Sequence, residues 1–113
     1  MNTLQDAVSF GETDQCRALI ALDPSCVNAE GWHGLTPLHG AATKGKLEVV
    51  SLLVESGALV NAVNSFGASP ALFACQAGNL LVLHELIQHG ASVEITDNAG
   101  RGCVHYSARS GCV

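Results

Sequence analysis

The sequence predicts an all-α solenoid in which about three and a half copies of a helix–turn–helix unit are joined by hairpin-like connectors. Three observations predict this fold. Glycines and prolines recur at a spacing of 33 residues along most of the chain. Each unit contains two short stretches with helical signals, and a turn-rich stretch follows them. A chain of 113 residues suits one domain made of such units.

The period is visible in three stretches of the chain. They read "GLTPLHGAATKG" (residues 34–45), "GASPALFACQAG" (67–78) and "GRGCVHYSARSG" (100–111), with glycine at both ends of each. His39 and His105 stand at the same position, and Leu72 occupies it in the middle copy. A period of this length across most of the chain indicates a stack of similar units.

The first helix of the unit is predicted at about residues 37–44 and again at 70–77. Thr36 and Ser69 precede a proline, and their side-chain oxygens can cap the free N–H groups of a new helix. Proline is tolerated at the first helical position because that N–H has no partner within the helix. Gly45 and Gly78 can take the left-handed conformation that ends a helix.

The second helix is predicted from apolar residues at helical spacing, and Gly57 and Gly90 end its two copies. These apolar residues are Leu47, Val50, Leu53 and Val54 in one unit, and Leu80, Leu83, Leu86 and Ile87 in the next. The stretches "ALVNAVNSFG" (58–67) and "ASVEITDNAG" (91–100) are rich in turn-forming and β-branched residues. We therefore expect extended, hairpin-like connectors there.

Residues 1–30 fit a looser copy of the unit. "LQDAVSFG" (4–11) and "TDQCRALIAL" (13–22) match the two helices, and "DPSCVNAEG" (23–31) matches the connector, with the register shifted by one residue. Such departures are expected of a terminal, capping unit. The prediction is one domain, 1–113, divided into an N-terminal capping repeat (1–30), repeat 2 (31–63), repeat 3 (64–96) and a partial repeat 4 (97–113).

Composition argues against several classes of function. The chain has 5 basic and 10 acidic residues and a net charge of −5, and its basic residues are scattered. Binding to nucleic acid needs a basic face, and binding to an anionic membrane needs a basic cluster. The first residues lack the pattern of a signal peptide, and no apolar stretch is long enough to span a bilayer. We therefore expect neither a nucleic-acid nor a membrane partner.

The low fraction of charged residues points to a protein partner, and the odd number of cysteines points to a location inside the cell. Charged residues make up 13% of the chain and mean hydropathy is positive, so apolar surface should remain exposed. The five cysteines are odd in number and form no CxxC pair. This usage favours a reducing compartment, with the cytoplasm or the nucleus as the expected location.

Thr36 to Ala41 reads T-P-L-H-x-A, the signature of ankyrin repeats, whose period is also 33 residues. The chain therefore resembles an ankyrin-repeat protein over essentially its whole length. The resemblance implies that Leu38 packs inward and that His39 forms a hydrogen bond toward a neighbouring repeat. The motif is degraded in repeat 4, where Gly102 and Cys103 replace Thr-Pro. Where the family usually has Asp at the connector turn, this chain has Gly31, Asn64 and Asp97, so the first turn is atypical.

The resemblance also implies a function, because ankyrin repeats bind proteins through the fingertips of their connectors and the concave face of their first helices. The residues that occupy those positions here include four of the chain's five aromatic residues, the type that interfaces favour at their energetic centres. We therefore predict a non-catalytic adaptor or scaffold. Its partner-binding residues would be Trp32, His33, Leu35, Lys44, Phe66, Phe73, Gln76, Arg101, Tyr106 and Arg109, with Lys44, Arg101 and Arg109 able to pair with acidic groups. The alternative is that the aromatic residues only cover neighbouring repeats.

Catalysis and metal binding receive little support. Cys103, His105 and Cys112 could be imagined as metal ligands, but zinc sites usually show four ligands in recognisable pairs. No nucleophile, base and orienting group stand out, and the glycines form no phosphate-binding loop. We expect no metal, no cofactor and no catalytic residue. The other three cysteines, Cys16, Cys26 and Cys75, are predicted to be small core residues.

Three further interpretations stay open. The chain could be the regulatory ankyrin arm of a larger enzyme. The resemblance also makes Asn61 a candidate substrate of an asparaginyl hydroxylase, with Leu53 and Val60 fitting the preferred context and Leu59 departing from it. The simpler interpretation is that Asn61 satisfies turn hydrogen bonds. Finally, repeat 4 stops after one helix, so we expect an uncovered apolar edge that either belongs to a fragment of a longer array or allows self-association.

Overall fold

The computed structural model describes residues 4, 7–8 and 11–92, apart from the side chain of Trp32. Residues 4, 7 and 8 are helical. Five further α-helices follow: α2 (Thr13–Leu22), α3 (Pro37–Lys44), α4 (Leu47–Glu55), α5 (Pro70–Ala77) and α6 (Leu80–Gln88). Two short 3₁₀ helices, η1 (Pro24–Asn28) and η2 (Trp32–Gly34), lie in the first connector. No strand occurs among these residues, which confirms an all-α solenoid.

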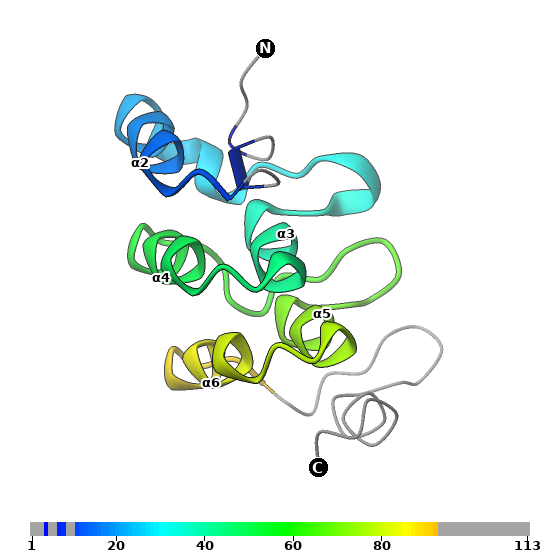
Figure 1. Cartoon of the computed structure of the whole chain (residues 1–113). Coiled ribbons are helices and arrows are strands. Elements are labelled where there is room, and N and C mark those ends of the chain that lie inside the picture. Colours follow the sequence, from blue (N-terminus) through cyan, green and yellow to red (C-terminus); the bar gives the residue numbers. More distant parts are fainter. Residues whose placement is uncertain (1–3, 5–6, 9–10, 93–113) are drawn as a thin grey trace.

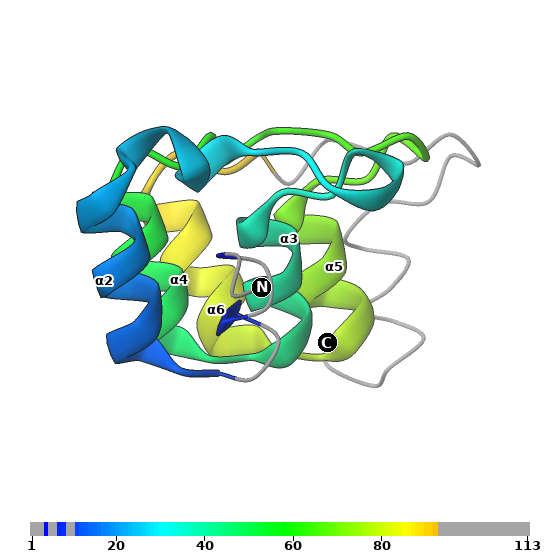
Figure 2. The same cartoon turned by 90° about the horizontal axis from the view of Figure 1, so that it is seen from above.

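The helices form two layers. Helices α2, α4 and α6 stack in one column, and α3 and α5 stack beside them in a second column (Figure 1). Seen from above, the connectors run across one end of both layers and project beyond α3 and α5 (Figure 2). The helix bounds confirm the predicted first and second helices of repeats 2 and 3. The predicted unit boundaries stay a prediction.

The core lies between the two layers, and it takes in only some of the apolar residues that predicted the second helices. Val50, Leu53 and Leu86 are fully buried, as a core-facing pattern requires. Val49 and Val82, which lie outside that pattern, are fully buried as well. By contrast, Leu47 is 38% exposed, Leu80 48% and Ile87 43%. These three residues share the apolar spacing but lie at the edge of the helix face that packs inward. Only part of the circumference of a surface helix contacts the core, so residues at the edge of that face stay partly exposed.

Local signals set the ends of the first helices. Ser69 Oγ accepts the N–H of Leu72 at 3.3 Å, which is the predicted cap. Gly45 ends α3 with φ +74°, and a Cβ atom placed there would lie 3.0 Å from the side chain of Asn79. Asn79 Nδ2 donates to the carbonyls of Ala42 at 2.8 Å and of Thr43 at 3.1 Å. These carbonyls have no partner within the helix, so a residue of the next repeat completes the end of α3.

His39 connects repeat 2 to repeat 3. Its side chain is fully buried, and Nε2 lies 2.9 Å from the carbonyl oxygen of Ala68 in the next connector. Its Nδ1 lies 3.1 Å from the backbone N of Thr36 and 2.9 Å from the Thr36 hydroxyl. A carbonyl only accepts and a backbone N–H only donates, so the ring must be neutral with its hydrogen on Nε2. The predicted bond of His39 toward a neighbouring repeat is thus confirmed, and Leu38 is buried as expected.

The connectors are tied to each other by asparagine side chains. Asn28 Nδ2 donates to the Gly57 carbonyl at 3.1 Å, and its Oδ1 accepts the Leu59 N–H at 2.8 Å. Asn61, 33 residues later, repeats both bonds with Gly90 and Ser92 at the same two distances. The amide group of asparagine is both donor and acceptor, so one side chain can bridge two backbone segments. Each such bridge holds one connector against the next.

Candidate functional site

The predicted partner-binding residues fall into three groups. Arg101, Tyr106 and Arg109 lie outside the described residues, as do His105, Cys103, Cys112 and the partial repeat 4. Trp32 begins η2, and its side chain lies outside what the structure describes. The remaining members are placed: His33, Leu35 and Phe66 on the connectors, Lys44 on α3, and Phe73 and Gln76 on α5.

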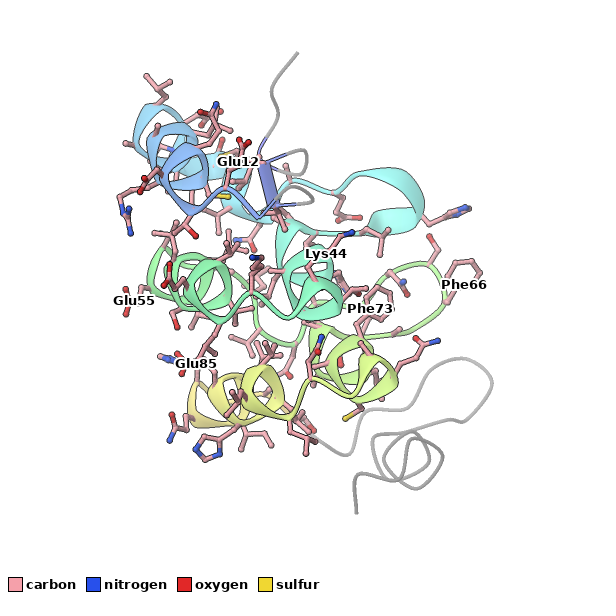
Figure 3. All side chains as sticks on the ribbon, in the orientation of Figure 1. Glu12, Lys44, Glu55, Phe66, Phe73 and Glu85 are labelled. Carbon is pink, nitrogen blue, oxygen red and sulfur yellow. The ribbon has the colours of Figure 1, made fainter. Side chains whose placement is uncertain are left out.

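The two fingertips form one hydrogen-bonded unit. The backbone N–H of Ser65 donates to the carbonyl of His33 at 2.9 Å, and the His33 and Phe66 rings lie 5.4 Å apart between centroids, tilted by 51°. Phe66 is 58% exposed, and Figure 3 shows it at the outer end of its connector. The structure therefore presents an exposed aromatic side chain on a tip that a second tip supports.

The two tips are built differently, as the sequence predicted. Asn64 Oδ1 accepts the N–H groups of Phe66 at 2.9 Å and of Ala68 at 3.0 Å, so an asparagine side chain organises the second turn. Gly31 offers no such side chain, and the first turn instead contains η2, with His33 at φ 55°. A positive φ disfavours a residue with a Cβ atom. The ring contact with Phe66 and the bond to Ser65 support His33 in this conformation.

Phe73 differs from Phe66 in its surroundings. It is half-buried against the core, and its ring lies edge-on to His39 with centroids 5.1 Å apart. Phe73 thus covers the buried histidine of the preceding repeat. This contact matches the alternative interpretation, in which the aromatic residues cover neighbouring repeats. Lys44 and Gln76 are exposed, and Lys44 forms no ion pair with any described residue. A role of these residues in binding stays a prediction.

Two surface hollows lie away from the predicted partner-binding residues. One, of about 650 Å³, is lined by Glu12, Thr13, Asp14, Gln15, Arg17 and Glu48. Another, of about 350 Å³, is lined by Gly45, Gly78, Asn79, Leu80, Leu81 and Val82. Neither hollow contains a predicted partner-binding residue. Among the described residues, no group of three or more His, Cys, Asp or Glu side chains is placed to hold a metal ion.

The described cysteines lie in or against the hydrophobic core. Cys16 and Cys75 are buried, which confirms them as small core residues, and Cys26 is half-buried against the same core. Burial raises the pKa of the Cys16 and Cys26 thiols, and nearby acidic groups add to this effect. Both groups therefore stay protonated near neutral pH, which makes them poor nucleophiles.

Asn61 makes the turn hydrogen bonds of the simpler interpretation. Both polar atoms of its amide bond to the next connector, as the equivalent atoms of Asn28 do. These bonds give Asn61 a structural role whether or not an enzyme modifies it. Hydroxylation of Asn61 stays a prediction.

Three apolar side chains outside the predicted partner-binding residues are exposed in the structure. On the second connector, Leu59 is 62% exposed and Val63 51%, while on α6 Leu81 is 73% exposed. A signal was available for Leu81, because the equivalent residue of the preceding repeat is Glu48, a typical surface residue. An apolar residue at a position that is charged in a sister repeat indicates exposed apolar surface.

The pH dependence of folding should report on His39. Burial lowers the pKa of His39, and the hydrogen bond to Ala68 opposes this only in part. An unfolded histidine titrates near pH 6.5, so the unfolded chain binds this proton more readily than the folded chain. The stability that His39 contributes is therefore complete above about pH 6.5 and is lost as pH falls toward the lower folded-state pKa.

We expect urea midpoints to show this directly. Between about pH 7.5 and pH 5.5 the wild type should lose more stability than His39→Gln, which cannot titrate. Because the other four histidines, His33, His84, His89 and His105, are present in both proteins, the difference isolates His39. An equal loss in the two proteins would mean that His39 has the same pKa folded and unfolded.

The fold and the site define a helical repeat solenoid with exposed fingertips. Comparison with protein-family models shows to which repeat family it belongs. The model described as "Ankyrin repeat" matches residues 33–65, and the model described as "Ankyrin repeats (many copies)" matches residues 72–111. Together they cover more than half of the chain, so the chain belongs to the ankyrin-repeat family. Ankyrin repeats are generally protein–protein interaction modules without catalytic activity.

Two curated relatives match part of the chain. The human protein "Transient receptor potential cation channel subfamily A member 1" is 41% identical over 58 residues, which is 50% of this chain and 5% of the relative. The "Probable E3 ubiquitin-protein ligase XBOS33" of Oryza sativa subsp. japonica is 41% identical over 56 residues, 49% of this chain and 11% of the relative. The match thus spans a small part of each relative. Among the described helices, none has the length and apolar character needed to cross a membrane.

Proposed function

We propose that this chain is a non-catalytic adaptor that binds a partner protein through its connector fingertips and the exposed side chains of α3 and α5. One observation carries the proposal. Phe66 leaves 58% of its surface exposed, yet two backbone hydrogen bonds to Asn64 Oδ1 brace its turn and the His33 ring lies against it. An aromatic side chain held in place before binding loses little entropy on binding and suits an interface centre.

The neighbouring side chains support an interface of mixed character. Lys44 lies at the end of α3, where Figure 3 shows it on the same side of the helix columns as Phe73. Its ammonium group forms no ion pair with a residue that the structure describes, so it is available to an acidic group of the partner. We place the protein in the cytoplasm or nucleus, which the free thiols of Cys16 and Cys26 support. The same surface would serve if the chain is the regulatory arm of a larger enzyme, which is the alternative.

Stability measurements separate the two described phenylalanines. We expect Phe66→Ala to change the free energy of unfolding by less than about 0.5 kcal/mol, because its side chain is largely in water. Phe73→Ala should cost about 1–3 kcal/mol, since it uncovers His39 and the core beside it. Urea denaturation followed by circular dichroism measures both. Equal losses would assign Phe66 to the scaffold.

Binding is tested with affinity capture from a cell lysate, read by mass spectrometry. The wild type is compared with the double variant Phe66→Ala, Lys44→Glu and with Leu22→Ala, a matched control that removes a side chain 83% exposed at the end of α2. We expect a set of proteins that the wild type and the Leu22 variant retain and the double variant loses. If all three chains retain the same proteins, the fingertip surface is not the binding site.

A further inference from the structure

Glu30 brings a carboxylate to the two fingertips. Its side chain is exposed and forms no hydrogen bond or ion pair with a residue that the structure describes. Its Oε1 lies 3.4 Å from the position that a Cβ atom on Gly34 would occupy, and Asn64 Cα and Ser65 N each lie 3.5 Å from the same position. Because Gly34 has no side chain, the carboxylate of the first connector can lie next to the turn that carries Phe66.

The two fingertip rings are attached close to this carboxylate. His33 directly precedes Gly34, and Phe66 directly follows Ser65. The Phe66 ring is largely exposed, and the His33 ring lies against it with the centroids 5.4 Å apart (Figure 3). The face of an aromatic ring carries partial negative charge and attracts a cation. An exposed phenylalanine ring and a carboxylate at one tip are therefore both suited to a positively charged group.

The chain supplies no such group from its described connectors. Residues 23–36 and 56–69, which include these connectors, contain Asp23 and Glu30 but no lysine or arginine. The Asp23 carboxylate accepts the backbone N–H of Ser25 at 3.2 Å and its hydroxyl at 2.6 Å. Lys44 ends α3, whereas the connector enters this helix at its other end, Pro37. The Glu30 carboxylate thus stays without a basic partner among the described residues.

We propose that the fingertips bind an arginine side chain of the partner protein, with its guanidinium group on the Phe66 ring and paired with the Glu30 carboxylate. This inference rests on the proposed function, because it names the chemistry that the fingertips recognise. Arginine suits the site better than lysine, since its planar guanidinium group can stack on an aromatic face and pair with a carboxylate. The net charge of −5 also attracts a basic segment at long range.

The test selects peptides on the folded, full-length chain. A display library of random peptides is selected in parallel, at neutral pH, on the wild type, Glu30→Gln, Phe66→Ala and Glu48→Gln. Glu48 is the matched control, because it is an exposed carboxylate on α4 and its replacement changes the net charge equally. We expect peptides enriched in arginine from the wild type and the control, and a loss of this enrichment with Glu30→Gln and Phe66→Ala. Circular dichroism verifies that each variant is folded.

Fluorescence anisotropy then measures one selected peptide in solution, with its arginine or with citrulline, the neutral isostere. Citrulline should weaken binding to the wild type about ten-fold, because it loses the ion pair and the cation–π contact. Glu30→Gln should weaken binding of the arginine peptide about three-fold, the size expected for an exposed ion pair. It should leave binding of the citrulline peptide unchanged. The citrulline comparison needs no change in the chain.

The outcomes separate this inference from the proposed function. Peptides that need Phe66 but are not enriched in arginine, or that bind Glu30→Gln as tightly as the wild type, overturn the arginine site and leave fingertip binding intact. A selection in which no peptide depends on Phe66 overturns both proposals. If Glu48→Gln weakens binding as much as Glu30→Gln does, the effect is one of net charge, and the arginine site is overturned as well.

Discussion

Replacing His39 with alanine is expected to cost about 2–4 kcal/mol of unfolding free energy, a large share of the stability of a chain of this size. The substitution leaves three buried partners of the ring without it: the Thr36 N–H, the Thr36 hydroxyl and the Ala68 carbonyl. It also removes the surface on which the edge of Phe73 rests. A buried polar group that loses its partner costs more than the hydrogen bond contributed.

Urea denaturation at neutral pH measures this loss. His84→Ala is the matched control, because it makes the same chemical change at an exposed histidine on a helix. We expect the control to change stability by less than about 0.5 kcal/mol. If both variants lose the same unfolding free energy, the hydrogen bonds of His39 to Thr36 and Ala68 do not contribute to stability.

Replacing Leu53 with alanine should have an effect of similar or greater size, about 2–5 kcal/mol. Leu53 is fully buried in α4, the middle helix of its column, so the cavity weakens packing toward both neighbouring repeats (Figure 1). In a solenoid each repeat is stabilised mainly by its neighbours. We therefore expect the variant to lose cooperativity as well, with a lower slope of unfolding free energy against urea concentration.

Leu47→Ala provides the comparison for Leu53→Ala. Both leucines lie on α4 and the substitution is identical, so helix propensity changes equally, but Leu47 is 38% exposed. We expect a loss below about 1 kcal/mol and an unchanged slope. A Leu53 variant that unfolds at the same urea concentration as the Leu47 variant would contradict the central position of α4 in the core.

Much of the fold could be predicted because its signals are local. Thr36 and Ser69 before proline, and Gly45 and Gly78 after the helix, act within one turn of the chain. Caps, a fixed proline φ and a left-handed glycine depend on neighbouring residues, so they are readable without tertiary structure. The 33-residue period then implied that the same unit is stacked, since one helical pair cannot bury its apolar face alone.

The candidate site was less predictable because exposure depends on which repeat lies alongside. Phe66 and Phe73 are chemically identical, yet Phe66 extends from a fingertip while Phe73 rests on His39 (Figure 3). Leu47 and Val49 are both apolar residues of α4, and only packing against the neighbouring helices makes Val49 the buried one.

The sequence by itself determined the family and the bounds of α3 and α5, because these follow from short-range patterns and their period. Tertiary structure alone decided which contacts join the repeats. The bridges of Asn28 and Asn61, the cap that Asn79 supplies to α3 and the bond from Ser51 to Glu85 all join residues 29 to 37 positions apart. Polar pairs at that separation leave no local signal, since either residue alone is an ordinary surface residue. Stacking of the repeats brings these residues within hydrogen-bonding distance.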